Sequence, residues 1–206
     1  MTEQKKFTPT VWNSVKKKES LTWGRILGSG NLIELLRERG YLSDGKTYLE
    51  IGFGYNRFLT GMEKAVRIGN FVGIEISELW VAEAKKEFPQ WTFRLGNVMK
   101  EEDLRDLGEF DYIFAWAVFQ HQYPSFEGAL RNLEGHLGKK GLLFFDIRIM
   151  GKPLLVPDGS AFNRIYTKKE VDKIIGRTNL EIVDSFFYSH EGVSKKNVFV
   201  LGRKGE

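Results

Sequence analysis

Residues 47–57 read Thr-Tyr-Leu-Glu-Ile-Gly-Phe-Gly-Tyr-Asn-Arg, and this is the most informative stretch of the chain. Tyr48, Leu49 and Ile51 predict a short buried strand. Gly52 and Gly54 then break the strand, and a helical pattern begins at about Arg57. A strand, a glycine turn and a helix in this order predict a site for a nucleotide-type ligand, because bare backbone and the free amides of a helix N-terminus can approach polar groups closely.

Glu50 stands two residues before the first glycine, at the carboxyl end of the predicted strand. A carboxylate there would repel the pyrophosphate of a dinucleotide, and the third glycine of the dinucleotide pattern is missing. The stretch instead resembles motif I of the class I S-adenosylmethionine-dependent methyltransferases, acid-x-Gly-x-Gly-x-Gly, whose ligand carries a sulfonium and an amino group. Asn56 replaces the third glycine. Asparagine enters left-handed backbone conformations more readily than most residues, so we expect the turn to tolerate it.

The resemblance covers roughly residues 47–201 and implies an α/β fold. It implies a single three-layer domain with a seven-stranded, mostly parallel sheet closed by a C-terminal antiparallel hairpin, and S-adenosyl-L-methionine as the cofactor. Glu75, at the end of the second predicted strand, would accept hydrogen bonds from both ribose hydroxyls, and Asn97 would accept one from the adenine amino group. The full set of cofactor-binding residues that the resemblance implies is Glu50, Gly52, Gly54, Tyr55, Asn56, Glu75, Ile76, Gly96, Asn97, Val98, Trp116 and Ala117.

Strand and helix patterns alternate along the rest of the chain. Ser77 is expected to cap a helix, and Thr167 with Glu170 forms a capping-box pattern. Residues 138–141 read as a turn and residues 148–166 as the longest irregular piece, which we expect to shape the substrate pocket. The expected strands are 47–51, 71–76, 91–95, 110–116, 142–147, 180–188 and 197–201, and the main expected helices are 29–40, 57–66, 78–88, 125–137 and 167–177.

His121 is the first candidate for a catalytic base, because it lies just past the fourth predicted strand. A base is needed only when the methyl acceptor is protonated, and a lone histidine can equally pack or cap. Asp146 and His190 are reserve candidates, whereas His136 is expected to be structural. No metal site is expected. The residues expected to contact the substrate are Trp12, Trp23, Tyr123 and Arg148.

Length and composition argue against a membrane-spanning, secreted or disulfide-bonded protein. The 206 residues suit one domain, and the longest apolar or aromatic run, residues 112–119, is far shorter than the roughly 20 residues of a membrane span. The N-terminus lacks the apolar segment of a secretory signal, so we expect a cytoplasmic protein without membrane contact. The absence of cysteine excludes disulfides, thiolate metal sites and cysteine nucleophiles.

The excess positive charge is concentrated at the N-terminus. Residues 1–40 hold eight Lys or Arg and four Asp or Glu, which leaves 23 of each sign in residues 41–206. We therefore expect a basic, aromatic arm and helix at 1–40, acting as a lid, and a cofactor-binding methyltransferase domain at 41–206. The arm could alternatively contact RNA through its lysines and tryptophans.

Three functions fit these patterns: methylation of a small-molecule oxygen or nitrogen, methylation of RNA or protein with the help of the arm, and cofactor binding without catalysis. The balanced charge of residues 41–206 favours the first, because RNA-binding domains usually carry a basic face. The chain also lacks the Asn/Asp-Pro-Pro-Tyr/Phe loop, which disfavours amino-directed DNA methylation and glutamine methylation. No sequence pattern specifies an oligomeric state.

Overall fold

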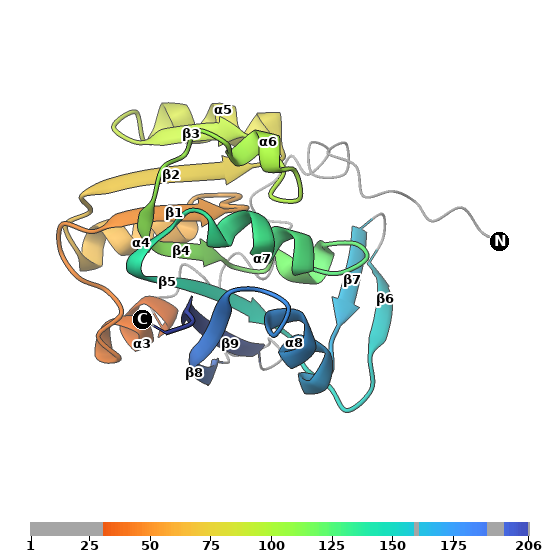
Figure 1. The fold of residues 1–206 in the computed structure, drawn as a ribbon. Coiled ribbons are helices and arrows are strands. Elements are labelled where there is room, and N and C mark those ends of the chain that lie inside the picture. Colours follow the sequence, from red (N-terminus) through yellow and green to blue (C-terminus); the bar gives the residue numbers. More distant parts are fainter. Residues whose placement is uncertain (1–30, 159–160, 189–195, 206) are drawn as a thin grey trace.

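A central sheet of seven strands organises the computed structural model, which describes residues 31–158, 161–188 and 196–205 (Figure 1). The strand order is β3-β2-β1-β4-β5-β9-β8. Strands β1 to β5 pair in parallel, and β9 runs antiparallel to both β5 and β8. This arrangement confirms the predicted α/β fold with its closing antiparallel hairpin. The strands are β1 (Thr47–Ile51), β2 (Asn70–Glu75), β3 (Thr92–Leu95), β4 (Phe110–Ala115), β5 (Leu137–Ile147), β8 (Leu180–Tyr188) and β9 (Lys196–Arg203).

Helices cover both faces of the sheet and make the outer two of three layers (Figure 1). Alternate residues of β1 point to opposite faces, so Leu49 and Ile51 join one buried cluster and Tyr48 joins the other. The first cluster includes residues of α6 (Glu101–Leu104), α7 (Glu127–Glu134) and α8 (Lys168–Ile175), and the second includes residues of α3 (Asn31–Glu38), α4 (Arg57–Ala65) and α5 (Glu78–Glu87).

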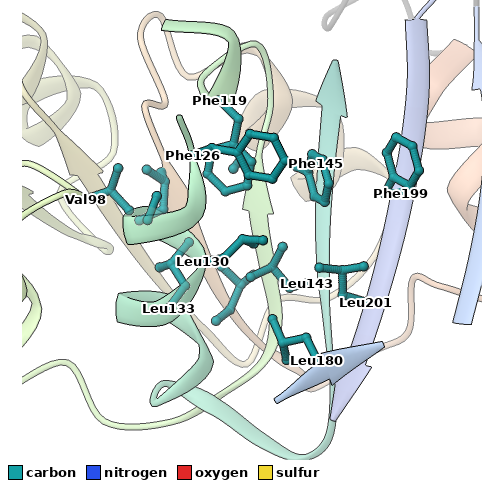
Figure 2. Packing of buried hydrophobic residues seen from close by; sticks show 14 of the residues in the cluster. Val98, Phe119, Phe126, Leu130, Leu133, Leu143, Phe145, Leu180, Phe199 and Leu201 are labelled. Carbon is teal, nitrogen blue, oxygen red and sulfur yellow. The ribbon is translucent and has the colours of Figure 1, made fainter. Parts of the chain in front are cut away.

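An aromatic group fixes the segment after β4 onto the sheet (Figure 2). Phe119, in the short 3-10 helix η2 (Phe119–His121), stacks on Phe126 with ring centroids 5.1 Å apart. Both rings contact Phe145 of β5, which stacks in turn on Phe199 of β9. Each of these side chains is buried, and burial of one such ring contributes about 1.5 to 3 kcal/mol. The chain that follows β4 is therefore firmly packed on one side.

The predicted helix caps are present. Ser77 Oγ accepts a hydrogen bond from the backbone N–H of Trp80 at the start of α5. At α8, Thr167 Oγ1 accepts from the N–H of Glu170, and the Glu170 carboxylate accepts from the N–H of Thr167. Reciprocal capping of this kind satisfies amides that have no partner inside the helix.

Two local predictions were wrong. The segment 148–166 contains an antiparallel hairpin, β6 (Leu154–Asp158) and β7 (Ala161–Ile165), which forms a separate two-stranded sheet. Its glycines and prolines suggest a loop, but Asp158-Gly159 is also a hairpin-turn signal, and Ile165 supplies the apolar face. The predicted turn at 138–141 instead lies within β5, where the pairing with β4 shifts register between Phe110 and Tyr112.

Across the described ranges, no helix is long and apolar enough to cross a membrane.

Candidate functional site

A pocket opens at the carboxyl ends of β1, β2 and β4, where parallel strands place their terminal loops along one edge of the sheet. Ten of the twelve residues assigned to the cofactor line it, and Glu50 and Asn56 lie outside the lining. The lining residues are Ile51, Gly52, Gly54, Tyr55, Ile74, Glu75, Ile76, Trp80, Gly96, Asn97, Val98, Trp116, Ala117, Val118, His121 and Gln122.

The glycine turn requires left-handed backbone at three positions. Gly52, Gly54 and Asn56 have φ angles of 67°, 50° and 55°. Asn56 thus adopts the left-handed conformation expected of the residue that replaces the third glycine. Its carbonyl accepts hydrogen bonds from the backbone N–H and the Oγ1 of Thr60, where α4 begins. The substitution therefore preserves the backbone path of the turn.

We expect Asn56→Ala to lower the free energy of unfolding by about 1 kcal/mol, since alanine enters the left-handed region less readily than asparagine. Asn56→Gly relieves the conformational strain and is expected to stay within about 0.5 kcal/mol of the parent protein. Urea unfolding of the three proteins measures both values. An equal loss for alanine and glycine would show that the Asn56 side chain, and not its φ angle, matters for stability.

Glu75 joins the turn after β1 to the turn after β2. Its Oε2 accepts a hydrogen bond from Gly54 N (3.1 Å), and its Oε1 accepts from Ile76 N (2.8 Å) and Ser77 N (3.0 Å). Burial raises the pKa of Glu75, and these three N–H groups oppose part of the rise. Because Oε2 holds a single donor, the carboxylate retains acceptor capacity on the pocket wall.

Glu50 is a buried carboxylate with an unsatisfied oxygen. It is 2% exposed, and Oε2 has no hydrogen-bond partner. Burial, followed by the nearby negative charge of Glu75, raises the pKa of Glu50 well above its ordinary value. Asn56 Oδ1 and Trp116 Nε1 are also buried without partners. Buried polar atoms are normally paired, so these three groups indicate a ligand or ordered water beside the glycine turn.

Aromatic side chains form another part of the pocket. Tyr55 and Trp80 meet edge to face, with ring centroids 4.0 Å apart. The sequence-based prediction missed Trp80, along with four other lining residues: Ile51, Ile74, Val118 and Gln122. A usable signal for Trp80 was its place in the first turn of α5, three residues after the cap Ser77 and close to the end of β2.

Asn97 is held by local hydrogen bonds at the far side of the pocket. Its backbone N–H donates to Asp103 Oδ2 (2.8 Å), and its Oδ1 accepts from Met99 N (3.0 Å). An amide oxygen has two lone pairs, so Oδ1 can accept one more hydrogen bond. The orientation of Asn97 is thus set before any ligand binds.

His121 lies in η2, is buried, and lines the pocket with Gln122. Its Nε2 lies 3.2 Å from Gln120 Nε2. Two substrate candidates, Tyr123 and Arg148, are absent from the lining, and Tyr123 is 48% exposed. The other two, Trp12 and Trp23, fall outside the described residues, as does the reserve base His190.

The remaining polar candidates have structural contacts. Asp146 accepts hydrogen bonds from Ala117 N, Tyr188 Oη and Lys196 Nζ, so it is not a free base for an acceptor. His136 Nδ1 lies 2.9 Å from the carbonyl oxygen of Gly108, in agreement with a structural role. Among the residues with described positions, no three His, Asp or Glu side chains come together as metal ligands.

Comparisons with known proteins agree with this geometry. Residues 49–145 match the family described as "Methyltransferase domain". The structure resembles an S-adenosylmethionine-dependent methyltransferase from Leishmania major, with a TM-score of 0.71 and 15% identity over 94% of this chain and 81% of that one. It also resembles one from Clostridium acetobutylicum, with a TM-score of 0.64 and 13% identity over 95% and 97% of the two chains.

A third similar structure is the magnesium protoporphyrin IX methyltransferase from Synechocystis, solved with bound S-adenosylhomocysteine. Its TM-score is 0.65 and its identity 16%, over 88% of this chain and 83% of that one. At these identities the likeness shows a shared fold. A search among curated proteins finds no match.

Proposed function

We propose that this chain, whose residues 49–145 match the methyltransferase-domain family, is an S-adenosylmethionine-dependent methyltransferase that acts on an oxygen or nitrogen atom of a small molecule. The observation that carries the proposal is the pair of buried carboxylates beside the glycine turn, Glu50 and Glu75. Two acids at this place disfavour a pyrophosphate and favour a ligand with cationic groups.

The residues present fit S-adenosylmethionine. Glu75 would accept the ribose hydroxyls with its remaining acceptor capacity, and Asn97 with Ile76 would receive the adenine. Glu50 Oε2 and Asn56 Oδ1, the buried oxygens without a partner, would lie nearest the amino-acid end of the cofactor. When bound, the cofactor supplies a methyl group already activated by its sulfonium.

The protein has to align the acceptor atom with the methyl group and exclude water from the site. Trp116, Ala117 and Val118 form an apolar wall at the end of β4, next to His121. His121 would take the proton from an acceptor that is protonated, and it plays no part when the acceptor is already a free amine. The segment that precedes α3, with Trp12 and Trp23, is proposed as the lid that covers the acceptor.

A small-molecule acceptor is supported by the balanced charge of residues 41–206. The similar structures include enzymes for a porphyrin and for a glycopeptide, so this fold serves more than one acceptor class. RNA or protein methylation through the basic arm is the second candidate, carried by the charge excess in residues 1–40.

Transfer of labelled methyl groups tests the acceptor class. The protein is incubated with methyl-tritiated S-adenosylmethionine and with small-molecule, RNA or protein fractions of a cell extract, and a Glu75→Ala variant serves as the control. We expect label in the small-molecule fraction only. Label in RNA that depends steeply on salt, and that is lost on deletion of residues 1–20, would contradict the small-molecule proposal and support the alternative.

The binding of cofactor is expected to depend on pH through Glu50. Below its raised pKa, Glu50 is protonated in the free protein, whereas a cationic ligand favours the carboxylate. Affinity should therefore rise as pH increases towards the raised pKa. The effect on folding has the opposite sign. A folded-state pKa above the unfolded one means that stability is greatest below the ordinary glutamate pKa and falls as pH rises through the raised pKa, by about 1.4 kcal/mol per unit of difference.

Glu50→Gln separates the two effects. At pH 8 we expect it to raise the melting temperature of the free protein, because the charge no longer has to be buried, and to weaken S-adenosylhomocysteine binding. Calorimetric titrations between pH 5 and pH 9 should lose most of their pH dependence in the variant. A lower melting temperature with unchanged binding would mean that Glu50 is only a structural acid.

A further inference from the structure

Asp146 lies near the carboxyl end of β5 and is completely buried. Its Oδ1 accepts a short hydrogen bond from the backbone N–H of Ala117. Its Oδ2 accepts from Lys196 Nζ at 2.7 Å and from Tyr188 Oη at 3.2 Å. The Lys196 side chain is itself only 9% exposed. One carboxylate therefore connects the last two strands of the sheet to the chain that follows β4.

Ala117 is the residue that needs this support. Its φ angle is 57°, a left-handed conformation that is costly for a residue with a Cβ atom. Ala117 lines the pocket together with Val118, His121 and Gln122, which follow it in the chain. A change of backbone conformation at this position would therefore move a whole wall of the pocket.

The aromatic packing around η2 does not restrain the backbone conformation of Ala117. Phe119 and Phe126 hold the chain two or more residues beyond Ala117. At Ala117 itself, the contact that fixes the direction of the backbone N–H is the bond to Asp146. Lys196 and Tyr188 hold the other oxygen of the same carboxylate, so Oδ1 stays aimed at this N–H.

We propose that Asp146 is a positioning residue, which, with Lys196 as its anchor, holds Ala117 in the left-handed conformation and so keeps the wall formed by residues 116–122 ready for the cofactor. The proposal rests on the proposed function only for the identity of the ligand. Without the restraint, the competent conformation is populated less, and the apparent affinity falls by that fraction.

A purely structural role is the rival explanation. A buried ion pair can often be replaced by apolar residues without loss of stability. Two double variants with the same formal charge as the parent protein separate the explanations. Asp146→Asn with Lys196→Met removes both charges but keeps an amide oxygen that can accept from Ala117 N. Asp146→Leu with Lys196→Met removes the charges and the acceptor together.

We expect the variant with Leu at position 146 to bind S-adenosylhomocysteine about tenfold more weakly, which corresponds to the usual size of the left-handed penalty. The variant with Asn should stay within about threefold of the parent protein, since its acceptor remains. Binding is measured by calorimetry, and thermal unfolding of each free protein shows whether the fold is retained.

Ala117→Gly provides the decisive rescue, because glycine enters the left-handed region without penalty. Added to the Asp146→Leu and Lys196→Met pair, it should restore most of the lost affinity, whereas a structural role for Asp146 predicts no rescue. Hydrogen exchange in the ligand-free proteins gives a second readout. The Ala117 amide should exchange faster in the Leu variant than in the Asn variant.

The outcomes are distinguishable. Equal affinity and equal exchange in the two double variants would overturn the positioning role, as would a loss that Ala117→Gly does not repair. If the Leu variant does not fold, hydrogen exchange of the Asn variant still decides, because its Ala117 amide should remain protected. Fast exchange at Ala117 with unchanged affinity would overturn the positioning role. No binding by the parent protein would instead overturn the proposed function, and the exchange data would still test Asp146.

Discussion

Replacing Glu75 by alanine is expected to weaken S-adenosylhomocysteine binding by about 100-fold or more. Hydrogen bonds to a charged group contribute about 1.5 to 3 kcal/mol each, and the ribose offers two hydroxyls to this carboxylate. Loss of the hydrogen bond from Gly54 N to Glu75 should weaken binding further, because this bond also orders the glycine turn. Calorimetric titration measures the change directly.

Two further variants separate the effect of the Glu75 charge from a general effect of removing an acid from this region. Glu75→Gln keeps the size of the side chain and an acceptor oxygen but loses the charge, so it should fall between the parent protein and the alanine variant. Glu78→Ala removes an exposed acid from the start of α5, three residues away, and should leave binding unchanged. Unchanged binding in Glu75→Ala would mean that the ligand does not contact this carboxylate.

Gly52→Ala is expected to cause the largest loss of stability, on the order of 2 to 4 kcal/mol. Two causes combine at this position. The φ angle of 67° is unfavourable for alanine, and an added Cβ would lie 2.5 Å from Val118 Cγ2. To avoid that clash either the Val118 side chain or the glycine turn must shift. Because both line the pocket, we also expect S-adenosylhomocysteine binding to be weakened strongly.

Gly45→Ala is the matched control, because its φ angle is 74° while an added Cβ would meet nothing within 4 Å. It should show the conformational penalty alone, about 1 to 2 kcal/mol. The double variant Gly52→Ala with Val118→Ala removes the clashing methyl group and should recover part of the stability. Equal losses at Gly52 and Gly45 in denaturant unfolding would show that contact with Val118 is unimportant.

The features that were predictable from sequence are those encoded locally. The strand, glycine turn and helix at residues 47–57 lie within a single stretch, and Glu75 is placed by the next strand. Even Asn56 could be assigned its left-handed conformation, because that preference belongs to the residue type. The alternation of strands and helices then left few topologies open.

The features that escaped prediction depend on contacts between distant residues. Asp146 gains its role from Ala117, 29 positions earlier, and from Lys196, 50 positions later. Trp80 lines the pocket because α5 packs beside the end of β2, and its position three residues after the cap Ser77 is only an indirect signal of that packing. The β6–β7 hairpin is stabilised by cross-strand pairs such as Leu154 with Ile165, and these outweigh the preference of its glycines and prolines for loops.

The assignment of the pocket is best tested by thermal unfolding of the protein alone and with S-adenosylhomocysteine, NAD or ATP added separately. A ligand stabilises only the state that binds it, by about 2.7 kcal/mol at a concentration 100 times its Kd. We predict a raised melting temperature with S-adenosylhomocysteine, absent in Glu75→Ala, and no shift with NAD or ATP. A shift with NAD and none with S-adenosylhomocysteine would contradict the assignment of the pocket at the carboxyl ends of β1, β2 and β4.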